Sequence, residues 1–189
     1  MHADFDAIVV GSGISGGWAA KELTERGLKV LLLERGRDVV HGTDYVGEHK
    51  APWELKFRGL NDRQKADADY PVQKLARAFE EGSTQFFVND REHPYQSDSA
   101  HPFTWIRGHH VGGRSLTWGR CSLRIGEFNL TEPARDGQGL DWPFRYGDID
   151  RWYTHVEDFA GISGTREGLE VVPDGQFLPP IPLNCVEEH

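Results

Sequence analysis

The sequence predicts an α/β fold built on a Rossmann-like β-α-β unit with an irregular insertion after it. Three observations predict this fold: an apolar strand pattern up to Val10, a glycine-rich turn that leads into a helical pattern, and a second apolar run at 30–33 that ends on Glu34. A strand, a crossover helix and a second parallel strand together make one such unit.

The glycine-rich turn, residues 11–16, has the spacing of a dinucleotide-binding fingerprint. Gly11 permits a tight turn, Gly13 lets a pyrophosphate approach the backbone, and Gly16 lets the helix lie close to the sheet. Free amides and the positive end of the helix dipole then face the phosphates. A glycine-rich turn without a ligand is the alternative, and the flanking strand, helix and acid favour the dinucleotide site.

The helical pattern runs from Ile14 to Arg26, and Gly27 is expected to end the helix. Glu34 closes the second strand, where a carboxylate is placed to accept hydrogen bonds from a ribose hydroxyl. A carboxylate there disfavours a 2′-phosphate, which argues against NADP.

Composition excludes several classes of partner. The net charge of −9 over 189 residues argues against a nucleic acid, and no apolar run approaches the length of a membrane span. The N-terminus has no basic segment followed by an apolar one, so we expect a cytoplasmic chain by default. Periplasmic export with a signal-bearing partner stays open.

Cys121 and Cys185 match no zinc or iron–sulfur spacing, and we expect two ordinary buried thiols. The nearest group of histidines is His93, His101, His109 and His110. None of them has the spacing of a metal-binding helix, so no metal site is expected.

The stretch 37–102 is a long polar and aromatic excursion. Within it we expect a helix that starts at Pro71 and ends at Gly82, and a short strand over 84–88. The apolar face of that helix would be Val72, Leu75, Ala76 and Phe79.

A second glycine-rich segment follows an expected strand at 103–106 and spans 107–119. Its consecutive glycines could lie against a flat or anionic ligand, with hydroxyls from Ser115 and Thr117 and an apolar wall from Trp118. A hairpin with a Gly-Gly turn explains the same pattern equally well.

A further helix is expected over 148–160, with Gly161 as its end and a proline-rich extended tail beyond it. The expected core stripe of this helix is Ile149, Trp152, Tyr153, Val156 and Phe159.

Four motifs in order resemble the N-terminal part of a glucose–methanol–choline (GMC) oxidoreductase: residues 11–16, 33–36, 111–118 and 141–143. More narrowly, they are similar to bacterial sugar and glycoside dehydrogenases and pyranose-oxidase-like members. The resemblance implies FAD as cofactor and hydride transfer from a CH–OH carbon of a sugar, glycoside or other alcohol to the flavin. It also implies a catalytic histidine far beyond these motifs, so we assign no catalytic residue.

By match, the first glycine segment would bind the pyrophosphate, Glu34 the adenosine ribose, and the second segment would lie near the flavin. The expected cofactor-binding residues are Gly11, Ser12, Gly13, Ser15, Gly16, Glu34, Arg35, Val111, Gly112, Gly113, Ser115, Thr117 and Trp118. Some relatives link FAD to a histidine at the position of Thr117, so FAD is expected to be non-covalent here. Arg114 replaces a usual small residue and would either pair with the phosphates or point to solvent.

The resemblance divides the chain into the β-α-β unit (1–36), the insertion (37–102), the flavin-proximal segment (103–126) and a helix with its tail (127–189). Family members run to several hundred residues, so the fold is expected to be incomplete, marginally stable alone and without turnover. The expected partners are a small alcohol or sugar and the missing C-terminal half or an electron-transfer subunit. The alternatives are a non-catalytic cofactor-binding or assembly subunit completed by a partner chain, and an NAD-dependent dehydrogenase domain.

Overall fold

The computed structural model describes residues 4–187. The chain forms two compact units, one up to Gly119 and the other from Arg120 onward. Both glycine-rich segments belong to the first unit, so the candidate site is built within that unit alone.

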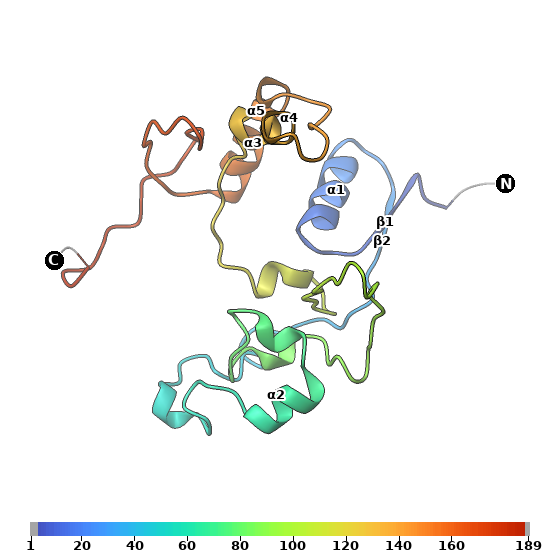
Figure 1. Ribbon diagram of the computed structural model, residues 1–189, viewed down its shortest axis with the longest axis vertical. Coiled ribbons are helices and arrows are strands. Elements are labelled where there is room, and N and C mark those ends of the chain that lie inside the picture. The colour runs from blue at the N-terminus through green and yellow to red at the C-terminus, as the bar shows by residue number, and fades with distance from the viewer. Residues whose placement is uncertain (1–3, 188–189) are drawn as a thin grey trace. The chain divides into compact units, whose positions relative to one another are not determined.

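The N-terminal segment is a β-α-β unit, as the sequence predicts. Strand β1 (Ala7–Val10), helix α1 (Ile14–Glu25) and strand β2 (Val30–Leu33) follow one another, and the two strands pair in parallel (Figure 1). Gly27, with φ of +83°, lies in the left-handed region just after the helix. The expected Rossmann-like topology is therefore confirmed.

The sheet has only these two strands among the described residues. Its apolar side chains are largely open to solvent, and Val10 is 81% and Ile8 63% exposed. A sheet of this type normally buries both faces and its edges. The exposed side chains agree with an incomplete nucleotide-binding sheet.

The aromatic core of the first unit lies in the insertion and not against the sheet. Helix α2 (Arg63–Asp69) borders it, and the side chain of Asp62 caps that helix by accepting from the Lys65 amide at 3.2 Å. The buried cluster consists of Ala66, Tyr70, Phe79 and Phe87. A sequence scan for apolar stripes misses α2 because it buries only Ala66.

The helix expected from Pro71 to Gly82 is wrong, since only a single 3₁₀ turn, Gln73–Leu75, forms there. Asp90 Oδ2 accepts from the amides of Val72 at 2.9 Å and Gln73 at 3.1 Å, and the Gln73 side chain is fully buried against the same carboxylate. Leu75, expected on the apolar face, is 66% exposed. A buried polar network thus replaces the expected helix face.

The strands expected at 84–88 and 103–106 are also wrong. Residues Thr84–Phe86 form a 3₁₀ turn, in which the Thr84 hydroxyl donates to the Glu80 carbonyl at 2.8 Å. In residues 103–106, backbone amides donate to side chains instead of to a neighbouring strand, as the Trp105 amide does to the Tyr95 hydroxyl at 3.1 Å. A further 3₁₀ turn spans Pro52–Glu54.

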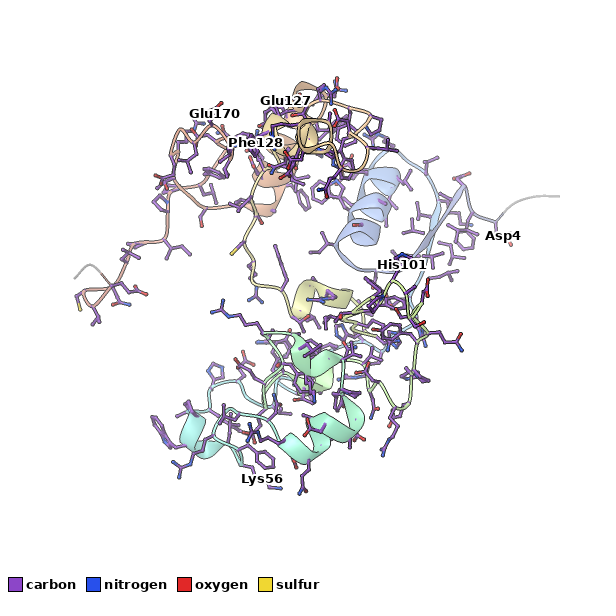
Figure 2. The ribbon with its side chains drawn as sticks, in the orientation of Figure 1. Asp4, Lys56, His101, Glu127, Phe128 and Glu170 are labelled. Atoms are coloured by element: carbon purple, nitrogen blue, oxygen red, sulfur yellow. The ribbon has the colours of Figure 1, made fainter. Side chains whose placement is uncertain are left out.

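The second unit contains α3 (Glu127–Leu130), α4 (Glu132–Asp136) and α5 (Tyr146–Ala160), of which only α5 is expected from sequence. Asp148 accepts from the Arg145 amide at 2.8 Å, which starts α5 slightly earlier than expected, and Gly161 ends it with φ of +67°. Glu127 and Phe128 of α3 are labelled in Figure 2. The Arg135 guanidinium lies over the Phe128 ring, with 3.8 Å between Arg135 Cζ and the ring centroid.

The expected core stripe of α5 is wrong for Trp152, Val156 and Phe159, which are exposed on this unit. The buried side chain of α5 is Glu157, which accepts two hydrogen bonds from Arg124, at 2.8 and 2.6 Å. An ion pair therefore anchors α5 to the segment before α3.

The two cysteines are exposed, so the expectation of buried thiols is wrong. Over residues 4–187, no group of three or more metal-ligating side chains is close enough to hold an ion. Within the same range, no helix combines the length and apolarity that crossing a membrane needs.

Candidate functional site

The two glycine-rich segments, about a hundred residues apart in sequence, contact one another. The Gly112 amide donates to the Ser12 hydroxyl at 3.1 Å. A Cβ on Gly113 would lie 3.4 Å from Gly13 Cα, so the two backbones meet with no side chain between them. This close approach explains why glycine occurs on both sides.

Each fingerprint glycine has a distinct geometric role. Gly11 has φ of +91°, in the left-handed region. A Cβ on Gly16 would fall 1.9 Å from the Gly11 carbonyl oxygen, so any other residue there would push helix α1 away from the turn. A Cβ on Gly13 would meet nothing closer than the Gly112 oxygen at 4.0 Å, which leaves the space in front of Gly13 open.

Two adjoining hollows flank Gly13. The helix-side hollow, about 380 Å³, is lined by Val10, Gly11, Gly13, Ile14, Ser15, Gly16, Arg114 and Ser115. The strand-side hollow, about 310 Å³, is lined by Gly11, Gly13, Glu34, Trp105, Ile106, Arg107, Gly108, His109, Gly113 and Arg114. Both volumes fall at the lower end of ligand cavities, and together the hollows offer an elongated site.

The start of helix α1 opens onto the helix-side hollow. Gly13 is its N-cap residue, no side chain caps it, and its first turn carries no acid. The first amides of a helix have no partner inside the helix. These amides and the helix dipole suit an anionic group such as a diphosphate.

Glu34 is ionised and held in place by the first glycine segment. Its carboxylate accepts from the Ser12 amide at 2.7 Å, from the Ser12 hydroxyl at 2.5 Å and from the Gly36 amide at 2.8 Å. These bonds, led by the Ser12 hydroxyl, lower the pKa of Glu34 to about 2. Each carboxylate oxygen can accept more than one bond, so a ribose hydroxyl can still be accommodated.

Gly36 brings the second glycine segment to the end of β2. A Cβ on Gly36 would lie 2.1 Å from the backbone of His109 and His110. The Val111 amide donates to the Arg37 carbonyl at 2.9 Å, and Arg37 and His110 form an isolated parallel bridge. Sequence reasoning missed the role of Gly36, although its place two residues after Glu34 was a usable signal.

The second glycine segment does not form a hairpin with a Gly-Gly turn, which was the alternative interpretation of its sequence. Gly112 and Gly113 have φ of +86° and +52°, and Gly113–Leu116 forms a 3₁₀ turn. The Ser115 hydroxyl donates back to the Gly112 carbonyl at 2.7 Å. The turn thereby presents its backbone to the first segment.

Of the expected site residues, seven line the hollows: Gly11, Gly13, Ser15, Gly16, Glu34, Gly113 and Ser115. Ser12 and Gly112 lie between the two segments and join them. The others line neither hollow: Arg35, Val111, Thr117 and Trp118. The cofactor role of all thirteen residues stays a prediction.

The wall formed by 105–109 was missed from sequence. Arg107 is buried, and its guanidinium donates to Asp90 at 3.2 Å and to the His93 carbonyl at 2.7 Å. The Trp105 ring lies over this guanidinium, with 5.1 Å between the ring centroid and Arg107 Cζ. Burial, followed by the charge of Arg35, lowers the pKa of His109, which favours the neutral imidazole.

A larger hollow of about 510 Å³ lies on the far side of His109, bordered by His93, His110 and α2 residues. His109 and His110 of the second glycine segment line it, but none of the glycines of either segment does. The glycine-lined hollows, and not this one, carry the dinucleotide geometry.

Comparison with known proteins identifies the cofactor. Residues 6–47, which include the whole β-α-β unit, match the family model described as FAD dependent oxidoreductase (DAO). The chain is 30% identical over 174 residues to the gluconate 2-dehydrogenase flavoprotein of Pantoea cypripedii, covering 85% of this chain and 26% of that protein.

Two further relatives are similarly distant. Paromamine 6'-oxidase of Streptomyces fradiae is 28% identical over 169 residues, covering 87% of this chain and 24% of the relative. The fructose dehydrogenase large subunit of Gluconobacter japonicus is 25% identical over 184 residues, covering 96% and 31%. The chain thus spans roughly a quarter to a third of the length of these relatives.

The geometry and the family match agree on one cofactor. The open backbone at Gly13 fits a diphosphate, the ionised Glu34 fits a ribose, and the match covers both positions. The chain carries a Rossmann-like FAD-binding fold, and the family match identifies FAD as its cofactor.

Proposed function

We propose that this chain is the FAD-binding part of an oxidoreductase of the GMC family that oxidises a CH–OH group of a sugar, glycoside or other alcohol. The observation that carries the proposal is the contact between the two glycine segments beside the ionised Glu34. Bound FAD would supply the hydride-accepting chemistry, while the protein supplies position and electrostatics.

The chain's own residues would divide the work of holding the cofactor. The amides at the start of α1 and the open face of Gly13 would receive the diphosphate. Glu34 would accept from the adenosine ribose, and its orientation is already fixed by Ser12 and Gly36. The turn at Gly113–Leu116 would lie toward the flavin end.

The relatives support the substrate class. Their names refer to gluconate, fructose and paromamine, which are polyhydroxylated compounds. The order of the four sequence motifs supports the GMC assignment. Which hydroxyl compound this protein oxidises depends on residues outside the two hollows.

Non-covalent FAD is part of the proposal. Thr117 occupies the position where a linking histidine is found in some relatives, and its hydroxyl is buried and directed to the Arg114 carbonyl at 3.5 Å. A threonine hydroxyl is a poor nucleophile at neutral pH without an adjacent base.

A second candidate is a cofactor-binding or assembly subunit completed by a partner chain. The exposed apolar side chains of β1 and β2 favour it, as do relatives named as a flavoprotein and a large subunit. Under this candidate, FAD binding is the same and hydride transfer belongs to the assembly. The FAD match argues against an NAD-dependent dehydrogenase domain.

The test is a titration of the purified chain with FAD and, separately, with NAD, followed by flavin fluorescence and by calorimetry. We expect saturable FAD binding and release of all flavin into the supernatant after acid precipitation. Binding of NAD without FAD would contradict the proposed function. Flavin retained in the precipitate would contradict the non-covalent mode of attachment but not FAD binding itself.

A further inference from the structure

Arg114 lies at the junction of the two hollows that flank Gly13. It lines both of them, and among the described residues it is the only basic side chain on the helix-side hollow. It follows Gly113, whose backbone approaches that of Gly13, so Arg114 belongs to the stretch where the two glycine segments meet.

The guanidinium of Arg114 is available for a ligand. Its Nη1 donates to the Ile106 carbonyl at 3.3 Å, and none of the described carboxylates forms an ion pair with it. A guanidinium has five N–H donors in a planar fork, so four donors remain. The side chain is exposed, which leaves these donors accessible.

A diphosphate at Gly13 would add negative charge next to a carboxylate, and a nearby cation would offset it. Glu34 contributes a carboxylate to the strand-side hollow, and the chain as a whole carries a net charge of −9. The other arginine there, Arg107, is buried and paired with Asp90. A diphosphate placed at Gly13 would therefore meet helix amides and a single uncommitted cation.

We propose that Arg114 binds the diphosphate of the dinucleotide and thereby makes the site selective for diphosphate-bearing ligands over riboflavin. This inference rests on the proposed function and adds a residue to it. Bidentate contacts between arginine and phosphate oxygens are strong because donor and acceptor are both charged. Arg114 is thus a specificity-determining binding residue whose exposed guanidinium serves the ligand.

The test compares three ligands against Arg114→Gln: FAD, ADP and riboflavin. ADP carries the diphosphate without the flavin, and riboflavin carries the flavin without the diphosphate. We expect Arg114→Gln to weaken FAD and ADP binding about tenfold or more, with riboflavin unchanged. Arg114→Lys should restore part of the loss, because it returns the charge without the fork.

Arg77→Gln is the matched control, since Arg77 is exposed, lines none of the hollows described above, and its loss changes net charge equally. It should leave the binding of all three ligands unchanged. Thermal unfolding of ligand-free Arg114→Gln should coincide with that of the unsubstituted chain, which shows that the Ile106 contact is not required for folding.

Three outcomes would overturn the inference. If Arg114→Gln bound FAD and ADP as tightly as the unsubstituted chain does, the guanidinium would have no role in binding. If the variant lost the same affinity for all three ligands, Arg114 would act only by holding the backbone at Ile106. If the unsubstituted chain bound neither FAD nor ADP, the proposed function and the inference would both fail. Arginine-dependent ADP binding without FAD binding would overturn the proposed function but support the diphosphate contact.

Discussion

Ser12 holds the candidate site together at the level of single residues. Its amide and hydroxyl both donate to Glu34, and the hydroxyl accepts from the Gly112 amide. One side chain therefore joins the first glycine segment, the end of β2 and the second glycine segment. This arrangement fixes the carboxylate before any ligand arrives, which lowers the ordering cost of binding.

Glu34→Gln is expected to destabilise the chain at neutral pH, and the effect should depend on pH. The pKa of Glu34 falls from an ordinary value of 4.5 to about 2 on folding. Its contribution is therefore complete above about pH 4.5, where the unfolded group is ionised, and is lost as the pH falls toward 2. Urea denaturation at pH 7 and pH 3 should show the gap between variant and parent narrowing at the lower pH.

Glu92→Gln serves as the control for this experiment, because the Glu92 carboxylate is exposed and accepts none of the hydrogen bonds made by the described residues. It should show no comparable pH-dependent gap. A Glu34→Gln gap of the same size at both pH values would mean that ionisation of Glu34 does not stabilise the fold.

Among the elements, those governed by local pattern are predictable from sequence. The β-α-β unit follows from short-range signals, namely an apolar strand, glycine spacing and Gly27 as a helix end. The spacing of apolar residues and Gly161 as a helix end predict helix α5, and this helix forms although most of that stripe is exposed. The fingerprint glycines carry the site signal because their roles are set within a few residues of chain.

The elements that sequence reasoning got wrong are governed by distant partners. Asp90 captures the backbone at Val72 and Gln73, and the Gln73 side chain accepts in turn from the Arg107 amide at 2.7 Å. The spacing of apolar residues predicts a helix there, but it carries no information about a hydrogen-bond network with residues distant in sequence. The role of Gly36 also depends on distant residues, since the backbone it touches lies at His109 and His110.

Helix α5 illustrates how an ion pair can replace an apolar face. Arg124 donates to both oxygens of Glu157, to Thr154 at 3.0 Å and to the Tyr146 hydroxyl at 2.9 Å. Burial alone would raise the pKa of Glu157, but the hydrogen bonds from Arg124 and from the Gln176 amide hold it below its ordinary value. Both groups are therefore charged and buried together.

Arg124→Met should cost the second unit about 3 kcal/mol, because it leaves Glu157 buried without its partner. The double variant Arg124→Met with Glu157→Met should recover part of that loss, since both charges are then removed. Urea denaturation followed by circular dichroism measures both variants. Arg151→Met is the control. It changes an exposed arginine on α5, the helix that carries Glu157, and should have little effect on stability.

A cost below about 1 kcal/mol for Arg124→Met would show that the pair does not anchor α5. A double variant less stable than either single variant would show that the two residues stabilise the unit independently of one another.

At the scale of the whole molecule, the candidate cofactor site is contained in the first unit, and the sheet next to it leaves its apolar side chains exposed. The chain spans 26% of the gluconate dehydrogenase flavoprotein and 31% of the fructose dehydrogenase large subunit. Exposed apolar strands cost stability unless something covers them. We therefore test FAD binding and turnover in separate experiments.

We expect the 189-residue chain to bind FAD without oxidising gluconate or fructose. The reason is that the match covers only 26% and 31% of these relatives, and the two hollows contain no side chain that we assign to substrate oxidation. Reduction of a dye acceptor in the presence of FAD and either compound is the measurement. Sustained dye reduction that requires the added compound would show that the chain is an enzyme by itself.

The central claim is that the diphosphate of FAD rests against bare backbone at Gly13, where the two glycine segments meet. Gly13→Ala tests it most directly, because the added methyl group meets no protein atom closer than 4.0 Å and Gly13 lines both hollows. Gly17→Ala, in the same helix and with only ordinary contact to Ser12, is the matched control. Titration with FAD should show Gly13→Ala at least tenfold weaker than the parent and Gly17→Ala unchanged, whereas equal affinity for all three would contradict the account.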